Sequence, residues 1–249
     1  NELKLSAGSS GAGALGESSN AFEAEVARFS ASVGSGGLFL SEATALTLGQ
    51  TAALTVKRVL GTGAVVNTDA SASVRTDAAQ DDVTSTGAVV ISTTAGSLTT
   101  LTGTGDISAS GHMLLSAGGS TSDITLGGTL SNAAGHTSVV AGRSIAQNAN
   151  ITASAAGLGV ELQATAGAVT LADGTAVQTN RGNVRVSAAG DITVGVIDAR
   201  ASDDRSTPGL SLQTHGTTPW GSVSLISSAG SILDNGSETV AATVDVFAN

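Results

Sequence analysis

The stretch "GNVRVSAAGDITV", residues 182–194, contains the pattern that decides the fold. In it a glycine and one further residue of any type twice precede an apolar–polar–apolar triplet, 184–186 and 192–194. Glycine tolerates the positive φ of a sharp corner, and alternation with period two sends one side chain inward and the next outward. The stretch therefore predicts two short, half-buried strands joined by a tight corner.

The same unit returns along the chain as "GDISA" (105–109), "GAVTL" (167–171) and "GSVSL" (221–225). In the most regular part, the first inward residues of successive strands are Ile145, Ile151, Val160, Val169, Val177, Val184 and Ile192. Three successive steps lead from Val169 to Ile192 and from Val160 to Val184, which is about two dozen residues in each case. Strands at this spacing leave no room for crossover helices. The spacing favours a parallel β-solenoid with about three short strands per coil.

The composition fits an all-β protein with a thin interior. Glycine accounts for 33 of 249 residues, aromatic residues for 2% and charged residues for 12%, and there is no cysteine. A narrow column of stacked coils is filled by small and β-branched side chains, so few large ones are needed. The net charge of −10 argues against nucleic-acid binding, and the absence of a stretch of about 18 apolar residues argues against membrane insertion.

Two stretches break the rhythm of a single solenoid segment that covers residues 1–249. They predict insertion loops near 67–87 and 198–221, of the kind that often gathers on one face of a solenoid. If the protein binds a ligand specifically, we expect these loops to carry the contacts, through Asp81 and Asp82 in the first and Arg205 and Trp220 in the second. A lone loop tryptophan more often covers a local apolar patch, and we favour that interpretation for Trp220.

Residues 17–34 allow two interpretations. Phe22, Val26 and Phe29 have near-helical spacing, but Phe22, Ala24 and Val26 also alternate, as do residues 29, 31 and 33. Ser, Gly and Val crowd both ends of the stretch, so we favour two strands over a helix.

The residues that carry chemistry do not form a catalytic or cofactor-binding motif. Asp106 and Asp191 each follow a corner glycine, where a carboxylate accepts hydrogen bonds from nearby backbone N–H groups. His112 and His136 follow corner glycines at matched positions, about one coil apart. They are therefore expected to stack on adjacent coils as surface residues.

The second insertion contains a candidate calcium site. Asp198, Asp203 and Asp204 would supply its carboxylates, and Arg200 and Arg205 would compete for them. We otherwise expect neither a metal nor a cofactor.

Both ends of the sequence have the pattern of strands. "NELKLSAGSS" (1–10) and "ETVAATVDVFAN" (238–249) alternate, and neither shows a cap helix. A last coil exposes unpaired backbone groups unless a neighbour covers it. We therefore expect one unit of a longer array, either a tandem repeat in one polypeptide or a subunit that stacks on copies of itself.

The segments "GSVSLISSAGSILDNG" (221–236), "SAAGDITVGVIDA" (187–199) and residues 1–40 resemble the large repetitive bacterial surface proteins of the filamentous-haemagglutinin type. In such proteins a "GSI" strand is typically followed by strands like "VDV" and "LKLSAG", and joining the end of this chain to its start reproduces that run. The resemblance implies a right-handed parallel β-helix, exported to the bacterial cell surface, that serves as an adhesin stalk or matrix fibre.

The sequence thus predicts a non-enzymatic structural segment of an extracellular fibre. Its partners would be copies of itself end to end and, at the loops, host-surface or matrix glycans. Two alternatives stay open: a polysaccharide-acting β-helix lyase or hydrolase, which would need carboxylates converging on one groove, and a carbohydrate- or Ca²⁺-binding module.

Overall fold

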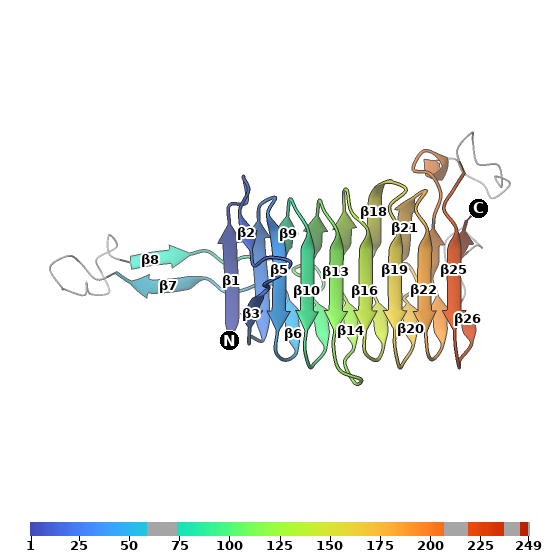
Figure 1. The fold of residues 1–249 in the computed structure, drawn as a ribbon, viewed down its shortest axis with the longest axis horizontal. Coiled ribbons are helices and arrows are strands. Elements are labelled where there is room, and N and C mark those ends of the chain that lie inside the picture. The colour runs from blue at the N-terminus through green and yellow to red at the C-terminus, as the bar shows by residue number, and fades with distance from the viewer. Residues whose placement is uncertain (59–73, 207–218, 237–244, 249) are drawn as a thin grey trace.

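The computed structural model describes residues 1–58, 74–206, 219–236 and 245–248. It shows a parallel β-solenoid, as predicted, in which coils of three strands stack along one axis (Figure 1). Register partners on the first face are Val89, Met113, Thr137, Val160 and Val184, which recur at intervals of about two dozen residues. The coil length predicted from the spacing is therefore confirmed.

The first face is one sheet whose strands pair in parallel, each with the equivalent strand of the next coil. It consists of β2 (Ala14–Leu15) and β3 (Phe22–Ala24), which both pair with β5 (Gly37–Glu42), then β10 (Val89–Thr93), β13 (Met113–Ala117), β16 (Thr137–Ala141), β19 (Val160–Ala164), β22 (Val184–Ala188) and β25 (Val223–Ser227).

The second and third faces join at the N-terminal end through one long strand, β4 (Arg28–Val33), which pairs with both. The second face holds β6 (Leu46–Leu48), β11 (Leu98–Thr100), β14 (Ile124–Leu126), β17 (Ile145–Gln147), β20 (Val169–Leu171), β23 (Ile192–Val194) and β26 (Ile232–Asp234). The third holds β1 (Glu2–Ala7), which pairs with β4, then β9 (Val83–Ser85), β12 (Ile107–Ala109), β15 (Leu130–Asn132), β18 (Ile151–Ala156), β21 (Ala176–Asn180), β24 (Val196–Asp198) and β27 (Val246–Phe247).

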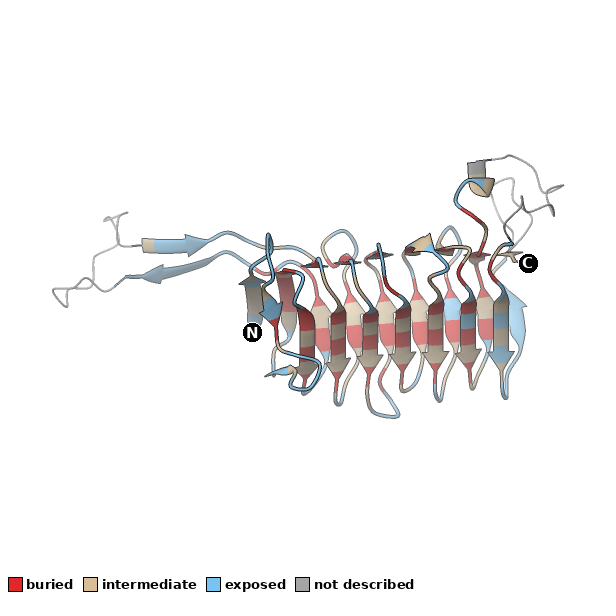
Figure 2. Cartoon of the chain, turned by 45° about the horizontal axis from the view of Figure 1, so that its top comes forward, coloured by how far each residue is buried: buried red, intermediate tan, exposed pale blue. Residues whose placement is uncertain are grey.

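Residues 17–34 form strands, as favoured, and not a helix. β3 and β4 lie in this stretch, and Phe29, Ala31 and Val33 of β4 are buried. The seven inward positions predicted between Ile145 and Ile192 are likewise all buried. Figure 2 shows how buried and partly exposed residues alternate along the strands, so that the core is a thin column between the three faces.

Glycines at the corners let successive coils approach closely. A Cβ added to Gly182 would overlap the carbonyl oxygen of Leu158 in the preceding coil, and one added to Gly142 would overlap that of Gly119. Overlap with backbone excludes any side chain at these positions. Close approach, as well as positive φ, therefore explains why glycine recurs at the corners.

The boundaries of the first insertion need correction. It leaves the coil after β6 and returns at β9, so it covers residues 49–82, and not 67–87 as predicted; residues 67–73 lie outside the described part. Its described strands, β7 (Leu54–Lys57) and β8 (Val74–Asp77), form an antiparallel hairpin. The prediction began too late because "LTVK" alternates like a coil strand, although its partner is β8 and not a neighbouring coil.

The second insertion lies between β24 and β25. Val184 has Val223 as its register partner, so the coil between them is more than one and a half times as long as the coil from Val160 to Val184. Asp198 itself is still the last residue of β24, and a short 3-10 helix, Asp204–Ser206, follows. Residues 207–218 of this insertion lie outside the described part.

Candidate functional site

Polar side chains at the corners bind the backbone of the following coil. Asp106 accepts a hydrogen bond from the N–H of Thr129 at 2.7 Å, and Asp191 accepts one from the N–H of Ser231 at 2.7 Å. Both were predicted to be turn residues that bind backbone N–H groups, and that is confirmed. Both carboxylates thus bind backbone groups of the protein itself, and they connect one coil to the next.

The two corner histidines form a stack, as expected from their spacing. The rings of His112 and His136 lie 5.6 Å apart at an angle of 7°. Nδ1 of His112 accepts a hydrogen bond from the N–H of His136, and Nδ1 of His136 accepts one from Gly159. An accepting Nδ1 requires that the neutral ring carry its proton on Nε2. The histidines therefore brace coils in the same way as the corner aspartates.

The densest group of charges lies at the base of the second insertion. Asp198 is buried, with 3% of its surface exposed, and both of its carboxylate oxygens bind arginine. Arg200 donates from Nε to Oδ1 at 3.0 Å and from Nη2 to Oδ2 at 2.8 Å, and Arg205 donates from Nε to Oδ2 at 3.2 Å. We call these three residues the Asp198 cluster.

The Asp198 cluster also ties several strands together. Nη2 of Arg205 donates to the carbonyl oxygens of Thr179, Asp198 and Arg200. The guanidinium carbon of Arg200 lies 3.9 Å from the ring centroid of Phe247. The cluster thus connects β21, β24 and β27 with the first residues of the insertion, which fixes the point where the insertion leaves the solenoid.

The electrostatics of this cluster bear on the predicted calcium site. Burial raises the pKa of Asp198, but hydrogen bonds from Arg200 and the charges of Arg205 and Arg200 outweigh it and leave the pKa below the usual 3.8. A cation at Asp198 would have to displace two guanidinium groups. Asp204, the third carboxylate of the predicted site after Asp198 and Asp203, accepts a hydrogen bond from the indole N–H of Trp220. Trp220 is half-buried, and this bond, which we call the clasp, connects the two ends of the insertion.

Within the described ranges, no three carboxylate or histidine side chains are grouped so that they would hold a metal ion. The same ranges contain no helix that is long and apolar enough to cross a bilayer.

The acidic pair of the first insertion has a different environment. Asp82 has φ 63°, a conformation that aspartate tolerates better than most residues, and its Oδ1 accepts the N–H of Asp106 at 3.0 Å. Burial and the charges of Asp106 and Asp81 raise the pKa of Asp82, although the hydrogen bond from Asp106 lowers it. Asp81 is exposed beside it. The pair is a point of negative charge where the insertion returns to the coil.

The stem of the β7–β8 hairpin is attached to the N-terminal strand. Lys4 in β1 donates through Nζ to the carbonyl oxygens of Asp77 and Ala78, and the side chain of Gln80 donates to the carbonyl of Leu5 at 3.2 Å. These bonds bridge an open groove between β1 and residues 76–80. They fix the direction in which the hairpin leaves the solenoid.

The two ends of the solenoid expose positions that are buried in its middle. The inward column of the second face runs through Leu46, Leu98, Ile124, Ile145, Val169 and Ile192, each at most 1% exposed, and ends at Ile232. Ile232 is 50% exposed. On the first face, Phe22 occupies the column of Leu40 and is 38% exposed. The sequence predicted that both ends of the stack are uncovered, but we did not name these residues. The regular coil spacing shows which residues belong to each inward column, and therefore which residue ends it.

Comparisons with protein-family models, with curated proteins and with solved structures give no match to this chain.

Proposed function

We propose that this chain is a structural segment of an extracellular bacterial fibre or adhesin stalk, in which β-solenoids stack end to end. The observation that carries the proposal is the half-exposed core at both ends, Phe22 at one and Ile232 at the other. A following coil would bury these side chains as every internal coil buries its neighbour. The neighbour is either the next repeat of the same polypeptide or a second copy, and the buried contact is of the same kind.

The edge strands support the same proposal. Among the described strands, β25, β26 and β27 pair on one side only, and so do β1, β2 and β3 at the other end. In the internal coils the first inward residue of a strand donates its N–H forward, as Ile192 does to Ser231 at 2.8 Å. By the same register, Ile232 directs its N–H toward the open end, where a further parallel strand would accept it.

What supports the extracellular bacterial setting is the resemblance of residues 187–199 and 221–236 to proteins of the filamentous-haemagglutinin type. Binding of host-surface or matrix glycans belongs to the same proposal, with the two insertions as the contact surfaces. In this role the protein performs no chemical step: hydrogen bonds between coils run along the axis, so that the stack resists extension cooperatively.

The test replaces an apolar contact at the open end with a charge. Ile232→Lys should abolish concentration-dependent association in sedimentation velocity, because a lysine in the core column would be buried without a partner. Ser224→Lys is the matched control: it lies in the last coil at an exposed, outward position of β25 and should associate like the parent. Equal association of both variants, or a parent chain that stays monomeric at high concentration, would contradict stacking.

A further inference from the structure

The β7–β8 hairpin projects beyond the N-terminal end of the solenoid, roughly along its axis. Figures 1 and 2 both show the hairpin continuing past β1, and Figure 2 shows it level with an upper edge of the stack and not across the open end. Every residue of β7 is exposed. A neighbour seated on the N-terminal coil would therefore have this hairpin along its flank.

One face of the hairpin carries two uncovered apolar side chains. Leu54 and Val56 lie on the same side of β7, are 57% and 51% exposed, and have Asp77 and Arg75 as register partners on that side. The opposite side carries Lys57 and Thr55, and the hydroxyl of Thr55 bonds that of Thr76 across the hairpin at 3.0 Å. An isolated two-stranded hairpin is at best marginally stable in water. A surface that covers Leu54 and Val56 would stabilise it.

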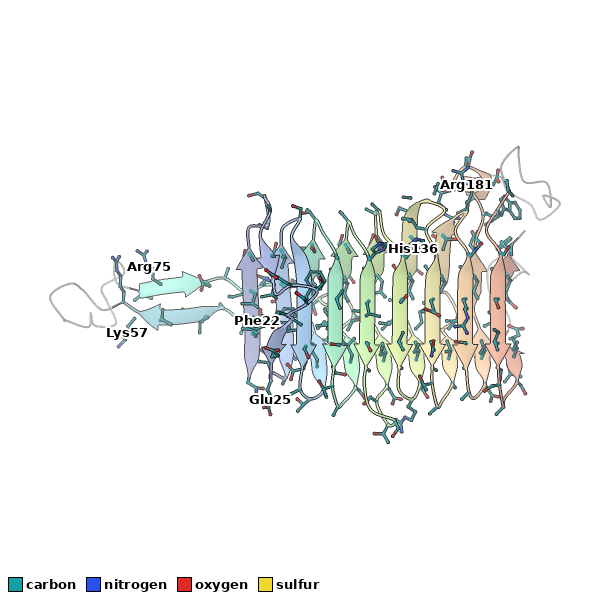
Figure 3. The ribbon with its side chains drawn as sticks, in the orientation of Figure 1. Phe22, Glu25, Lys57, Arg75, His136 and Arg181 are labelled. Carbon is teal, nitrogen blue, oxygen red and sulfur yellow. The ribbon has the colours of Figure 1, made fainter. Side chains whose placement is uncertain are left out.

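The described part of the hairpin carries exposed cations, in a chain whose net charge is −10. They are Lys57, Arg58 and Arg75, against one exposed acid among the described hairpin residues, Asp77, and the sequence between the two strands adds Asp69. Figure 3 shows Lys57 and Arg75 on the projecting part of the hairpin. None of the three cations makes an ion pair within the part of the chain that the structure describes. Arg75, on the side of Leu54 and Val56, is therefore available to bind a carboxylate on a surface that covers these two side chains.

The topology identifies that surface on another copy. The hairpin leaves the corner between the second and third faces, because it follows β6 and precedes β9. In the C-terminal coils the same corner carries Asp173, between β20 and β21, and Asp234, at the end of β26. Both are exposed, and neither has an ion-pair partner among the described residues.

The dimensions agree with this placement. Four strand residues span about 13 Å, and stacked coils are about 4.8 Å apart, so β7 covers between two and three coils. Asp234 lies in the last coil and Asp173 two coils before it. If the solenoid continues from one copy to the next, both carboxylates lie within the length of the hairpin.

We propose that the hairpin is a strap that lies along the second-to-third-face corner of the preceding copy, with Leu54 and Val56 covered there and Arg75, on the same face, directed at Asp173 and Asp234. The partner is a second copy of this chain, or the preceding repeat of a longer one. The inference rests on the proposed end-to-end stacking and adds to it an electrostatic contact outside the core. It predicts that association weakens with salt.

The first experiment reverses charges on the full chain. Arg75→Glu should raise the dissociation constant in sedimentation velocity at low salt by roughly tenfold. Asp173→Lys/Asp234→Lys should do the same, and an equimolar mixture of the two variants should recover the association of the parent. Lys57→Glu, with the same change of net charge on the opposite face of the hairpin, should weaken association much less.

The second experiment locates the contact by cross-linking, which the absence of native cysteine makes clean. Val56→Cys mixed with Asp173→Cys should give a covalent dimer with a short bis-maleimide. Val56→Cys mixed with Glu161→Cys, on the first face, should not. Thermal melts of each variant confirm that it is folded.

The outcomes separate this inference from the proposed function. If hairpin reversal leaves association unchanged while Ile232→Lys abolishes it, the strap is wrong and stacking stands. If the mixture of complementary variants fails to recover association, or the control pair cross-links equally well, the strap is also wrong. A parent chain that never associates overturns both.

Discussion

The two insertions of this solenoid use charge in opposite ways. The second is anchored by the Asp198 cluster, in which a carboxylate with 3% exposure binds two arginines. The first carries its cations, Lys57, Arg58 and Arg75, on an exposed hairpin. Charge in the second insertion is satisfied within the molecule, whereas charge in the first is available to something outside it.

This difference shows which insertion is architecture and which is surface. Buried ion pairs are costly to break, because removal of one partner leaves the other uncompensated. Exposed cations contribute little to folding and much to the approach of a partner. Substitutions in the second insertion should therefore change stability, and equivalent substitutions in the first should change association.

The largest effect is expected for Asp198→Asn. The substitution removes the charge that both arginines bind, and we expect the free energy of unfolding to fall by about 3 kcal/mol. Asp77→Asn in the hairpin is the control and should stay within about 0.5 kcal/mol of the parent. Denaturant titration measures both. Similar losses for the two variants would remove the contrast between the insertions.

A pair of arginine substitutions gives the next largest effect. Arg205→Ala leaves the carbonyl oxygens of Thr179, Asp198 and Arg200 without this donor, and should cost about 2 kcal/mol of stability. Arg75→Ala should leave the melting temperature unchanged and weaken association at low salt. A lower melting temperature for Arg75→Ala would show that the hairpin contributes to the stability of the single chain.

The sequence predicted the coil architecture because its determinants are local. A corner glycine, a polar brace such as Asp191 and an alternating triplet recur with a fixed period, so inward positions could be identified one by one. The hairpin was missed for the opposite reason. "LTVK" at 54–57 has the alternation of a coil strand, and only its pairing partner, Val74–Asp77, distinguishes the two.

The candidate sites were predictable to a lesser extent. The competition of Arg200 and Arg205 for Asp198 could be read from their proximity in sequence, and the structure shows both bound to it. The exposure of Ile232 could not be read from its residue type, which matches that of the buried Ile192 in the same column, and it needs the coil register as well. Exposure there depends on position at an end of the stack and not on local sequence.

A smaller effect is expected at the clasp of the second insertion. Trp220→Phe keeps the apolar ring but removes the indole N–H that binds Asp204, and should cost about 1 kcal/mol. Asp204→Asn should cost no more than that, because its amide oxygen still accepts the bond. Urea unfolding followed by circular dichroism measures both. No loss in Trp220→Phe would mean that the hydrogen bond does not hold the base of the loop.

The smallest expected effect is on how the free energy of unfolding depends on pH, and there Asp198 and Asp82 should act in opposite directions. The pKa of Asp198 is lowered in the folded protein, so its stabilisation is present above the usual value of 3.8 and is lost as pH falls through the lowered pKa. The pKa of Asp82 is raised, chiefly by burial and by the charges of Asp106 and Asp81. Its ionised form therefore costs stability, and that cost grows as pH rises through the raised pKa.

Asp82→Asn should consequently stabilise the protein at neutral pH by a few tenths of a kcal/mol. The asparagine still accepts the N–H of Asp106 and tolerates φ 63°. On acidification through the raised pKa the gain should disappear, because the carboxyl of the parent is then protonated. The difference in free energy of unfolding between Asp198→Asn and the parent should also shrink on acidification, but here because the parent loses stability. If acidification moved the two differences in the same direction, the two insertions would not differ electrostatically as their burial and partners indicate.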